Sequence, residues 1–536
     1  MSATLSQSSI SEKSRIGYSQ GSDEKNFLTA KNAIDGSDLP EKFFTASNDE
    51  INKAVEMASA AFLLLKKTTS EQRAGFLDTV AAELDAERPV VIERARLESA
   101  LTLARLDGEL NRTINQLKLF ATLLRSGLHA DATIDLAKNE DGSVRYDIRK
   151  VQVPLGPVVV FGASNFPLAF SVAGGDTASA WAAGCPVIVK AHNGHLGTSS
   201  IVAAVVVRAG KKCAMPEGFF SLIFGRGFDA GMALVKHPLV KAVGFTGSYS
   251  GGKALFDAAN QRKEPIPVFA EMGSLNPVLL LPEALEKRNE QIATTFAGSI
   301  TQGNGQFCTK PGLFLALEGN GFDLFLKHLK TKLAEVDAQH MLNENICSAF
   351  KAGLNKNIVS QTGVEYTAAG KPAGERTVQA GIATVNGKTF LSNPHLHEEV
   401  FGPFALIISC TSPAELKAVA ESLGGQLTAT VIATDEELNK HEEVIDVLKE
   451  KTGRIIFNGI PTGVEVCSAM HHGGPFPASS FSQFSSVGSD AIRRFLRPLC
   501  FQAWPNNALP EELKNENPEK IWRRVNGKLT NEGLIS

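Results

Sequence analysis

The stretch Val158-Val159-Val160-Phe161-Gly162-Ala163-Ser164-Asn165-Phe166-Pro167 decides the fold class of this chain. Four consecutive apolar residues, three of them β-branched, followed by glycine, are typical of a strand that is buried on both faces. Comparable apolar runs follow, separated by helical stretches such as 177–183 and 198–208; they lie at 187–190, 221–224 and 242–245. Strands that alternate with helices predict a parallel sheet covered by helices on both faces.

The same alternation continues beyond residue 272 and predicts a second α/β domain. Its apolar runs lie at 278–281, 314–317, 405–409, 427–433 and 454–458. Upstream of the first sheet, residues 49–127 show helical periodicity, whereas residues 129–153 alternate polar and apolar positions as exposed antiparallel strands do.

Composition excludes several classes of protein. A chain of 536 residues with 43% hydrophobic and 21% charged residues suggests two or three domains. The net charge of -3 offers no basic surface for nucleic acid, and no apolar stretch approaches the roughly 20 residues of a membrane span. Seven cysteines without close pairs favour a reducing compartment, and the polar residues 1–25 predict a flexible tail without a signal peptide. We therefore expect a cytoplasmic protein.

The segment Gly305-Gln306-Phe307-Cys308-Thr309-Lys310-Pro311 supplies the candidate nucleophile, Cys308. It follows a turn-prone run, 302–305, where a sulfur atom would be reachable. A working cysteine needs a lowered pKa, and a glycine-rich turn that opens a helix would supply it. A buried, unreactive thiol is the commoner fate of a lone cysteine.

Glu271 and Asn165 are candidate partners of Cys308. Glu271 ends the apolar run 266–270 and precedes a glycine, so we expect it at a strand end, where partial burial would raise its pKa towards that of a general base. The Asn165 amide, together with the Cys308 backbone N–H, would donate to the oxyanion of a carbonyl under attack. Taken singly, Glu271 would be a solvated loop charge and Asn165 a turn residue.

Four histidines, His192, His195, His471 and His472, raise the question of a metal site. Their spacing on glycine-flanked loops, with no cysteine or carboxylate partners nearby in the sequence, is poor ligand geometry. The sequence predicts no metal.

The segments 271–277 and 305–311, with Asn165-Phe166-Pro167, closely resemble the signatures of the aldehyde dehydrogenase superfamily. The resemblance extends from about residue 26 to about 525 and is sharpest for the branch of 2,5-dioxovalerate (α-ketoglutarate semialdehyde) dehydrogenases. Its branch-specific stretches are 162–190, 457–464, 473–477 and 494–498. Three features depart from the pattern: a longer interval from Glu271 to Cys308, Ser164 in place of an aromatic residue, and no second glutamate after Ser480.

The resemblance implies an α/β fold with a Rossmann-like cofactor domain, a second α/β catalytic domain and a small β oligomerisation hairpin. The implied boundaries are 1–25 for the tail, 26–128 and 154–271 for the cofactor domain, 272–472 for the catalytic domain, 129–153 and 491–515 for the oligomerisation element, 473–490 for a return to the cofactor domain, and 516–536 for a C-terminal extension. It also implies a homodimer or homotetramer.

A nicotinamide cofactor follows from the same resemblance, although no G-x-G-x-x-G motif follows the first strand. The helix that opens at Gly247 and Ser248, with Gly252, would hold the pyrophosphate at its N-terminus. By resemblance, Lys190 contacts the adenosine ribose, Glu399 binds the nicotinamide ribose and Phe401 backs the ring. No carboxylate follows Lys190, where an NAD-specific enzyme commonly places one to hold the ribose hydroxyls. Arg226 follows the next strand and could meet a 2′-phosphate. NADP is therefore slightly favoured over NAD.

By resemblance, Cys308 attacks an aldehyde and Glu271 activates the water that releases a carboxylic acid. The favoured substrate is 2,5-dioxopentanoate, giving 2-oxoglutarate, in a tunnel lined by Phe170, Phe307 and Val464, with Arg112 meeting a carboxylate. A fatty or medium-chain aldehyde is the alternative substrate. Two further functions stay open, an acylating enzyme that uses coenzyme A and a non-catalytic structural relative. Glu271 argues against the acylating enzyme.

Overall fold

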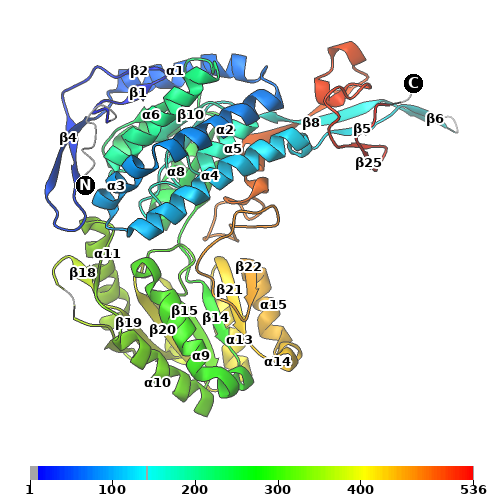
Figure 1. Ribbon diagram of the computed structural model, residues 1–536. Helices are drawn as coiled ribbons and strands as arrows, with labels where there is room; N and C mark the ends of the chain where they lie inside the picture. Colours follow the sequence, from blue (N-terminus) through cyan, green and yellow to red (C-terminus); the bar gives the residue numbers. More distant parts are fainter. Residues whose placement is uncertain (1–9, 141–142, 373, 535–536) are drawn as a thin grey trace.

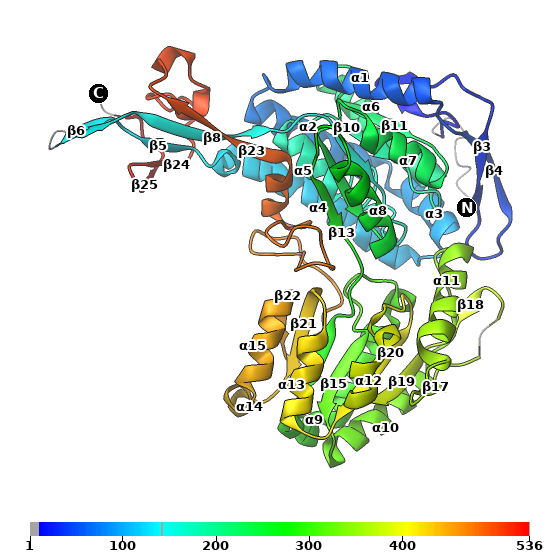
Figure 2. The ribbon, with the colours of Figure 1, turned by 180° about the vertical axis from the view of Figure 1, so that it is seen from behind.

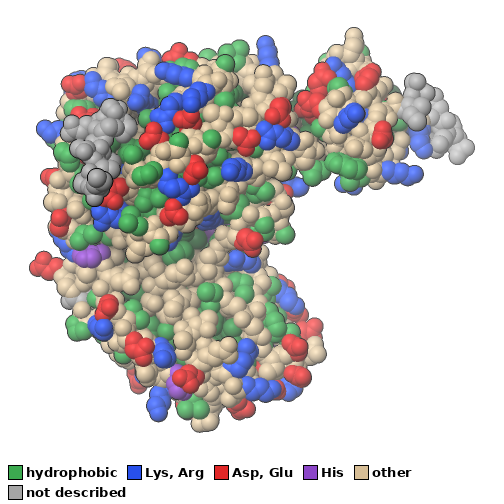
Figure 3. Space-filling model, in the orientation of Figure 1, with side chains coloured by type: hydrophobic (Ala, Val, Ile, Leu, Met, Phe, Trp, Pro, Cys, Tyr) green, Lys and Arg blue, Asp and Glu red, His purple; other side chains and the backbone are tan. Residues whose placement is uncertain are grey.

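The computed structural model describes residues 10–140, 143–372 and 374–534. Figures 1 and 2 show two bodies, each built on its own sheet, and an arm that projects from the upper body. The surface is hollowed between the two bodies (Figure 3). The predicted α/β class with two sheets and a β arm is confirmed.

The upper body is built on a sheet of order β13-β12-β9-β10-β11-β1-β2, in which the first five strands are parallel. These five are β9 (Val158–Phe161), β10 (Val187–Lys190), β11 (Phe220–Ile223), β12 (Ala242–Thr246) and β13 (Val268–Glu271). After β11 the chain returns to the other side of β9. The carboxyl ends of β9 and β12 therefore flank a topological switch point, where open α/β sheets bind ligands.

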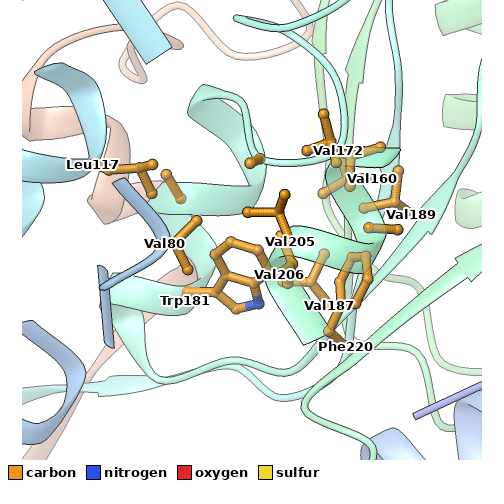
Figure 4. Packing of buried hydrophobic residues seen from close by; sticks show 14 of the residues in the cluster. Val80, Leu117, Val160, Val172, Trp181, Val187, Val189, Val205, Val206 and Phe220 are labelled. Atoms are coloured by element: carbon orange, nitrogen blue, oxygen red, sulfur yellow. The ribbon is translucent and has the colours of Figure 1, made fainter. Parts of the chain in front are cut away.

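Helices cover both faces of this sheet (Figures 1 and 2). They are α1 (Asn48–Leu65), α2 (Ser70–Ala86), α3 (Arg88–Ser99), α4 (Leu103–Ser126), α5 (Gly175–Ala183), α6 (Leu196–Lys212), α7 (Gly227–Lys236) and α8 (Tyr249–Asn260). Figure 4 shows the core on one side, where Val80 of α2 and Leu117 of α4 lie near Trp181 and the valines of β9 and β10. The strands present β-branched apolar side chains on this face, and the apolar side chains of the helices pack against them.

The lower body contains a sheet of order β17-β19-β20-β15-β14-β21-β22, parallel except for β17. The strands are β14 (Pro277–Leu280), β15 (Leu313–Leu317), β17 (Glu365–Ala368), β19 (Gly381–Asn386), β20 (Phe404–Cys410), β21 (Gln426–Ile432) and β22 (Thr452–Phe457). The main helices of this body are α9 (Pro282–Thr301), α10 (Asn320–Ala334), α11 (Glu344–Leu354), α13 (Pro413–Ser422) and α15 (Glu442–Lys451). The sequence predicted five of these strands and missed β17 and β19.

The arm is a five-stranded sheet of order β23-β8-β5-β24-β25. Its strands are β5 (Thr133–Asp135), β8 (Ile148–Pro154), β23 (Leu496–Gln502), β24 (Arg523–Val525) and β25 (Lys528–Thr530), and the hairpin β6 (Lys138–Glu140) and β7 (Ser143–Arg145) lies beyond β5. Ile134 and Val151 share a small core with Leu513 and Ile521 from the chain end. The expected boundary at residue 516 is therefore wrong, because residues 516–534 complete the arm.

The N-terminal segment is also more ordered than the sequence predicts. β1 (Arg15–Ile16) pairs with β11 and with β2 (Ser19–Gln20), and the backbone N–H of Ser11 donates to Ser200 Oγ. The expectation of a flexible tail is wrong for residues 10–25, because strands of two residues are too short to show periodicity. Residues 1–9 lie outside the described structure. A hairpin of β3 (Phe27–Lys31) and β4 (Asp38–Phe44) follows.

None of the helices formed by the described residues is both long and apolar enough to cross a membrane. All seven cysteines of the chain are described, and each is a free thiol.

A buried ion pair fixes the segment just before β23 to the upper body and generates a prediction. Arg494 Nη1 lies 2.7 Å from Asp176 Oδ1 at the start of α5, and both side chains are at most 5% exposed. Asp176→Leu leaves the guanidinium buried without an anion, so we expect a loss of about 3–5 kcal/mol in unfolding free energy. The double variant Asp176→Leu/Arg494→Met should lose much less. Urea unfolding followed by circular dichroism measures both, and equal losses would contradict the assignment.

Candidate active site

Residues 472–486, which follow the last strand of the lower sheet, return to the upper body and bring new side chains to the end of β13. The backbone N–H of Met272 donates to Ala478 O at 2.8 Å, and that of Ser480 donates to Ala270 O at 3.0 Å. Glu271 itself forms a bridge with Ser479. The segment therefore runs antiparallel to β13 and carries His472 and Ser486 to the Glu271 side chain.

Three reactive side chains meet at this point. His472 Nε2 lies 3.4 Å from Cys308 Sγ and 3.0 Å from Glu271 Oε1. The Ser486 hydroxyl donates to Glu271 Oε2 at 2.5 Å. Glu271 and His472 are 4% and 1% exposed, so the carboxylate and the imidazole interact in a low-dielectric environment. The structure thus brings Glu271 and Cys308 together, as the sequence predicted, and adds a histidine between them.

The loop that carries Cys308 is held from both sides. A Cβ at Gly305, whose φ is +66°, would collide with the backbone of Gly402 and Pro403, so only glycine permits this close approach. The Asn276 side-chain amide donates to Cys308 O at 2.8 Å and to Lys310 O at 2.9 Å. The position of the sulfur is therefore set by the loop that follows Glu271.

The resting Cys308 is a protonated thiol. Burial and the neighbouring Glu271 carboxylate raise the pKa of the Cys308 thiol well above its ordinary value. The expected helix N-terminus is absent from this part of the described chain, because Cys308 lies in a turn between the 3₁₀ helix Gln302–Gly305 and β15. The expectation that a helix lowers this pKa is wrong, and the proton has to leave through a neighbouring base.

The pKa of Glu271 differs from the expectation as well. Burial raises the pKa of the Glu271 carboxyl, but the neighbouring His472 and the hydrogen bond from Ser486 outweigh burial and hold that pKa below its usual value. The predicted upward shift is wrong. Glu271 is ionised at neutral pH and is available as a base without a further step.

Asn165 lies in the loop after β9, as expected. Its Nδ2 donates to Gln306 O at 3.1 Å, which places the amide against the Cys308 loop. One amide hydrogen is used in this bond. The second has no acceptor among the described residues and stays available to a substrate oxygen.

A cavity of about 290 Å³ opens in front of the sulfur. Cys308 and His472 lie at its wall, and the predicted tunnel residues Arg112, Phe170, Phe307 and Val464 line it as well. Arg105 and Glu109 of α4 also belong to the lining, although the sequence pattern did not identify them as site residues. Their signal was the spacing of Arg105, Glu109 and Arg112, which places all three on one face of a helix.

The two arginines lie against aromatic rings. Arg105 Cζ is 4.5 Å from the Phe166 ring centre, and its Nη1 donates to Glu109 Oε2 at 2.9 Å. Arg112 Cζ is 5.0 Å from the ring centre of Phe170. Glu109 Oε1 is already occupied by two backbone N–H groups, and Arg112 forms no ion pair or hydrogen bond with the described residues. The cavity therefore contains one guanidinium without an anion.

Five of the predicted cofactor residues lie at the carboxyl edge of the upper sheet: Lys190, Arg226, Gly247, Ser248 and Gly252. Ser248 caps α8, and its exposed N-terminus follows the switch-point strand β12. The Thr246 hydroxyl at the end of β12 is buried without a partner, and a Cβ at Gly252 would contact Met272. A pyrophosphate fits at this helix N-terminus.

Lys190 ends β10, and Arg226 follows the end of the neighbouring strand β11. Lys190 is paired in register with Ile223, and Arg226 follows three residues later as an exposed side chain. Lys190 Nζ donates to Asn193 Oδ1 at 3.0 Å, and burial lowers the pKa of Lys190 to about 8.

Glu399 and Phe401 come from the lower body. The Glu399 carboxylate lies against Gly273, beside the loop that follows Glu271, and burial raises its pKa. Phe401 is half-buried next to Gly402, which packs on Gly305. Glu399 therefore lies beside the loop that follows Glu271, and Phe401 adjoins the residue that packs on the Cys308 loop.

Two of the four histidines support the loop after β9, and a third, His472, lies in the site. His195 Nε2 lies 2.8 Å from Ala163 O and its ring stacks with that of His192, so these two residues support the β9 loop. His472 does have a cysteine and a carboxylate partner, contrary to expectation. No signal in the sequence indicated the contact between His472 and Cys308, because 164 residues separate the two.

Comparisons with known proteins identify the family of the chain. The model of the aldehyde dehydrogenase family matches residues 22–498. The chain is 49% identical over 489 residues to alpha-ketoglutaric semialdehyde dehydrogenase 2 of Azospirillum brasilense, covering 91% of this chain and 93% of that protein. It is 45% identical over 502 residues to an alpha-ketoglutaric semialdehyde dehydrogenase of Acinetobacter baylyi, covering 93% and 95%.

Solved structures show the same fold. A 1-pyrroline-5-carboxylate dehydrogenase from Thermus with bound NAD aligns with a TM-score of 0.77 at 20% identity, over 91% of this chain and 92% of that one. Betaine aldehyde dehydrogenase from Staphylococcus aureus in complex with NAD+ aligns with a TM-score of 0.78 at 18% identity, over 92% and 96%. The chain therefore belongs to the aldehyde dehydrogenase family and is an NAD(P)-dependent oxidoreductase.

Proposed function

We propose that this protein oxidises 2,5-dioxopentanoate, the semialdehyde of α-ketoglutarate, to 2-oxoglutarate. The observation that carries the proposal is the unpaired Arg112 guanidinium in the cavity of Cys308. A substrate with an aldehyde at one end and a carboxylate at the other supplies both the electrophile and the missing anion. The names of the two relatives at 49% and 45% identity support the same substrate.

The charges of the cavity favour an anionic chain over a neutral one. Arg105 is partly neutralised by Glu109, whereas burial lowers the pKa of Arg112, a sign that its charge is poorly solvated. A carboxylate relieves this cost and forms charge-assisted hydrogen bonds. The aromatic lining would also accept a fatty or medium-chain aldehyde, but such a chain leaves Arg112 without an anion.

Cys308 is the nucleophile of the proposed reaction. The thiol proton passes to His472 Nε2, and the Glu271 carboxylate, 3.0 Å away, stabilises the imidazolium that forms. The sulfur then bonds to the aldehyde carbon. The carbonyl oxygen becomes an oxyanion, which the Asn165 amide and the Cys308 backbone N–H hold.

A nicotinamide held in this site would supply the acceptor for the hydride of the former aldehyde carbon, and Cys308 would then carry the acyl group as a thioester. Glu271 then takes a proton from a water molecule that attacks this thioester. The C–S bond breaks and the carboxylic acid leaves. A hydrolytic base at this position supports an acid product over transfer of the acyl group to coenzyme A.

For the cofactor, Gly247, Ser248 and Gly252 would hold the pyrophosphate, Lys190 the adenosine ribose, and Glu399 with Phe401 the nicotinamide ribose and ring. A preference for NADP over NAD is supported by two features: no carboxylate follows Lys190 through residue 195, and Arg226 is exposed without a partner among the described residues. A cation in this place suits a 2′-phosphate.

A homodimer or homotetramer is supported by two unpaired strand edges. Within the described chain, β23 pairs only with β8, and β22 pairs only with β21. Exposed apolar side chains accompany both edges, namely Ile148 and Trp504 on the arm and Ile455 and Phe457 on β22. Such edges are usually covered in soluble proteins, and a second subunit would cover them. The seven free cysteines suit a cytoplasmic location.

The substrate proposal predicts a charge-specific loss in Arg112→Gln. Removing a charge-assisted contact of about 1.5–3 kcal/mol should lower kcat/KM for 2,5-dioxopentanoate about 10- to 150-fold. The value for pentanal, which has no carboxylate, should stay nearly constant. Steady-state reduction of the nicotinamide measures both. The matched control is Lys118→Gln, an exposed cation on the same helix. An equal loss for both aldehydes would refute carboxylate recognition by Arg112.

Glu271→Gln should separate the first half of the reaction from the second. Because Glu271 is required for hydrolysis, the variant should give a burst of about one reduced nicotinamide per active site and then turn over slowly. The Glu271 charge also raises the pKa of Cys308, so its removal should lower that pKa. The pH dependence of alkylation by iodoacetamide should shift to lower pH. Cys308→Ala is the control without a burst; a shift to higher pH would contradict the electrostatic assignment.

Arg226→Ala tests the cofactor preference. Loss of a charge-assisted contact with the 2′-phosphate should lower kcat/KM for NADP about 10- to 150-fold and leave NAD nearly unaffected. Initial rates at varied cofactor concentration provide the comparison. Equal losses with the two cofactors would show that Arg226 does not contact the phosphate.

A further inference from the structure

The three reactive side chains have the arrangement of a metal site. One ligand atom from each of Cys308, His472 and Glu271 lies within 4.8 Å of the other two. Cys308 Sγ is 3.4 Å from His472 Nε2, which is 3.0 Å from Glu271 Oε1. In a tetrahedral zinc site, bonds of about 2.3 Å to sulfur and about 2.0 Å to nitrogen or oxygen place neighbouring ligand atoms roughly 3.3–3.6 Å apart. Small rotations of side chains would satisfy these values.

One of these ligand atoms lacks a hydrogen-bond donor. Glu271 Oε1 is buried, and although His472 Nε2 lies 3.0 Å away, no described residue donates a hydrogen bond to this oxygen. The other oxygen of the same carboxylate is fixed by the Ser486 hydroxyl, so the carboxylate has a defined orientation. An orphaned, oriented carboxylate oxygen next to a thiol and an imidazole is a strong ligand set.

We propose that Cys308, His472 and Glu271 bind one Zn²⁺ ion, and that the ion reversibly inhibits the enzyme. The ligands are one sulfur, one nitrogen and one oxygen atom, a set that suits Zn²⁺ and not Mg²⁺ or Ca²⁺, which prefer oxygen ligands alone. On binding, the S–H bond of Cys308 breaks, the proton leaves to solvent and a Zn–S bond forms. No oxidation occurs.

The bound ion would occupy the residues needed for catalysis. Cys308 and His472 line the cavity that admits the aldehyde, so the fourth coordination position faces the cavity and takes a water molecule. The sulfur can then no longer attack, and Glu271 can no longer serve as a base. Zn²⁺ therefore competes with the aldehyde, and a chelator restores activity.

The test measures zinc binding directly on the tag-free, full-length enzyme. Equilibrium dialysis with ZnCl₂ should give one ion per chain for the wild type. In His472→Gln the affinity should fall by more than about 100-fold, since the loss of an outer-shell partner alone costs about 10- to 100-fold. His471→Gln changes the neighbouring, half-exposed histidine and should bind zinc as the wild type does.

Two further measurements distinguish zinc at this site from zinc bound elsewhere on the chain and from misfolding of the variant. Zn²⁺ should protect Cys308 of the wild type from iodoacetamide, and EDTA should remove this protection, whereas in His472→Gln the same concentration should not protect. Thermal unfolding and NADP binding of His472→Gln verify that the variant is folded, and Cys308→Ala provides a second variant that should lose the ion. Zinc binding of equal strength in wild type, His472→Gln and Cys308→Ala, or no binding by the wild type, would overturn the proposal.

Discussion

The active site depends on one side chain, Asn276, whose amide is hydrogen-bonded to the carbonyl groups of Cys308 and Lys310. Asn276 stands just before β14, whereas Glu271 ends β13 five residues earlier, so a short link between the two sheets sets the distance from Glu271 to Cys308. Gln426 fixes this link by accepting hydrogen bonds from the backbone N–H groups of Leu275 and Asn276. These groups are buried, and an unpaired amide there would cost about 1–3 kcal/mol. The network therefore favours one geometry of the site.

Electrostatics explains how a buried carboxylate and a buried thiol coexist. Glu271 is kept ionised by His472 and Ser486, and burial together with the Glu271 charge keeps the thiol of Cys308 protonated. In the proposed reaction, activation of Cys308 therefore depends on transfer of its proton to His472, the residue between the two. A thiol that is protonated at rest also reacts slowly with oxidants and electrophiles that enter the cavity without a suitable carbonyl.

Much of the fold could be predicted from the sequence because the parallel strands are short apolar runs with clear boundaries, and β9 and β10 coincide with the predicted residues. Cys308 and Glu271 could be proposed as site residues from the sequence, since each lies in a distinctive local segment, and the structure places them close together. His472 was not, because its partners are distant in the chain and only the antiparallel return along β13 brings them together. The pKa directions were wrong for the same reason: burial and neighbours decide them, and neither is visible in a local pattern. The substrate and cofactor assignments remain predictions.

The arm has a consequence for the order of events during synthesis. Its central strands, β5 and β8, leave the ribosome long before their neighbours β23 and β24; the backbone N–H of Leu136 donates to the Asn526 side chain, 390 residues downstream. Until β23 and β24 have been synthesised, β5 and β8 expose unpaired edges and the small core around Ile134 stays open. The arm therefore forms late during synthesis, and a nascent chain carries an aggregation-prone edge in the meantime.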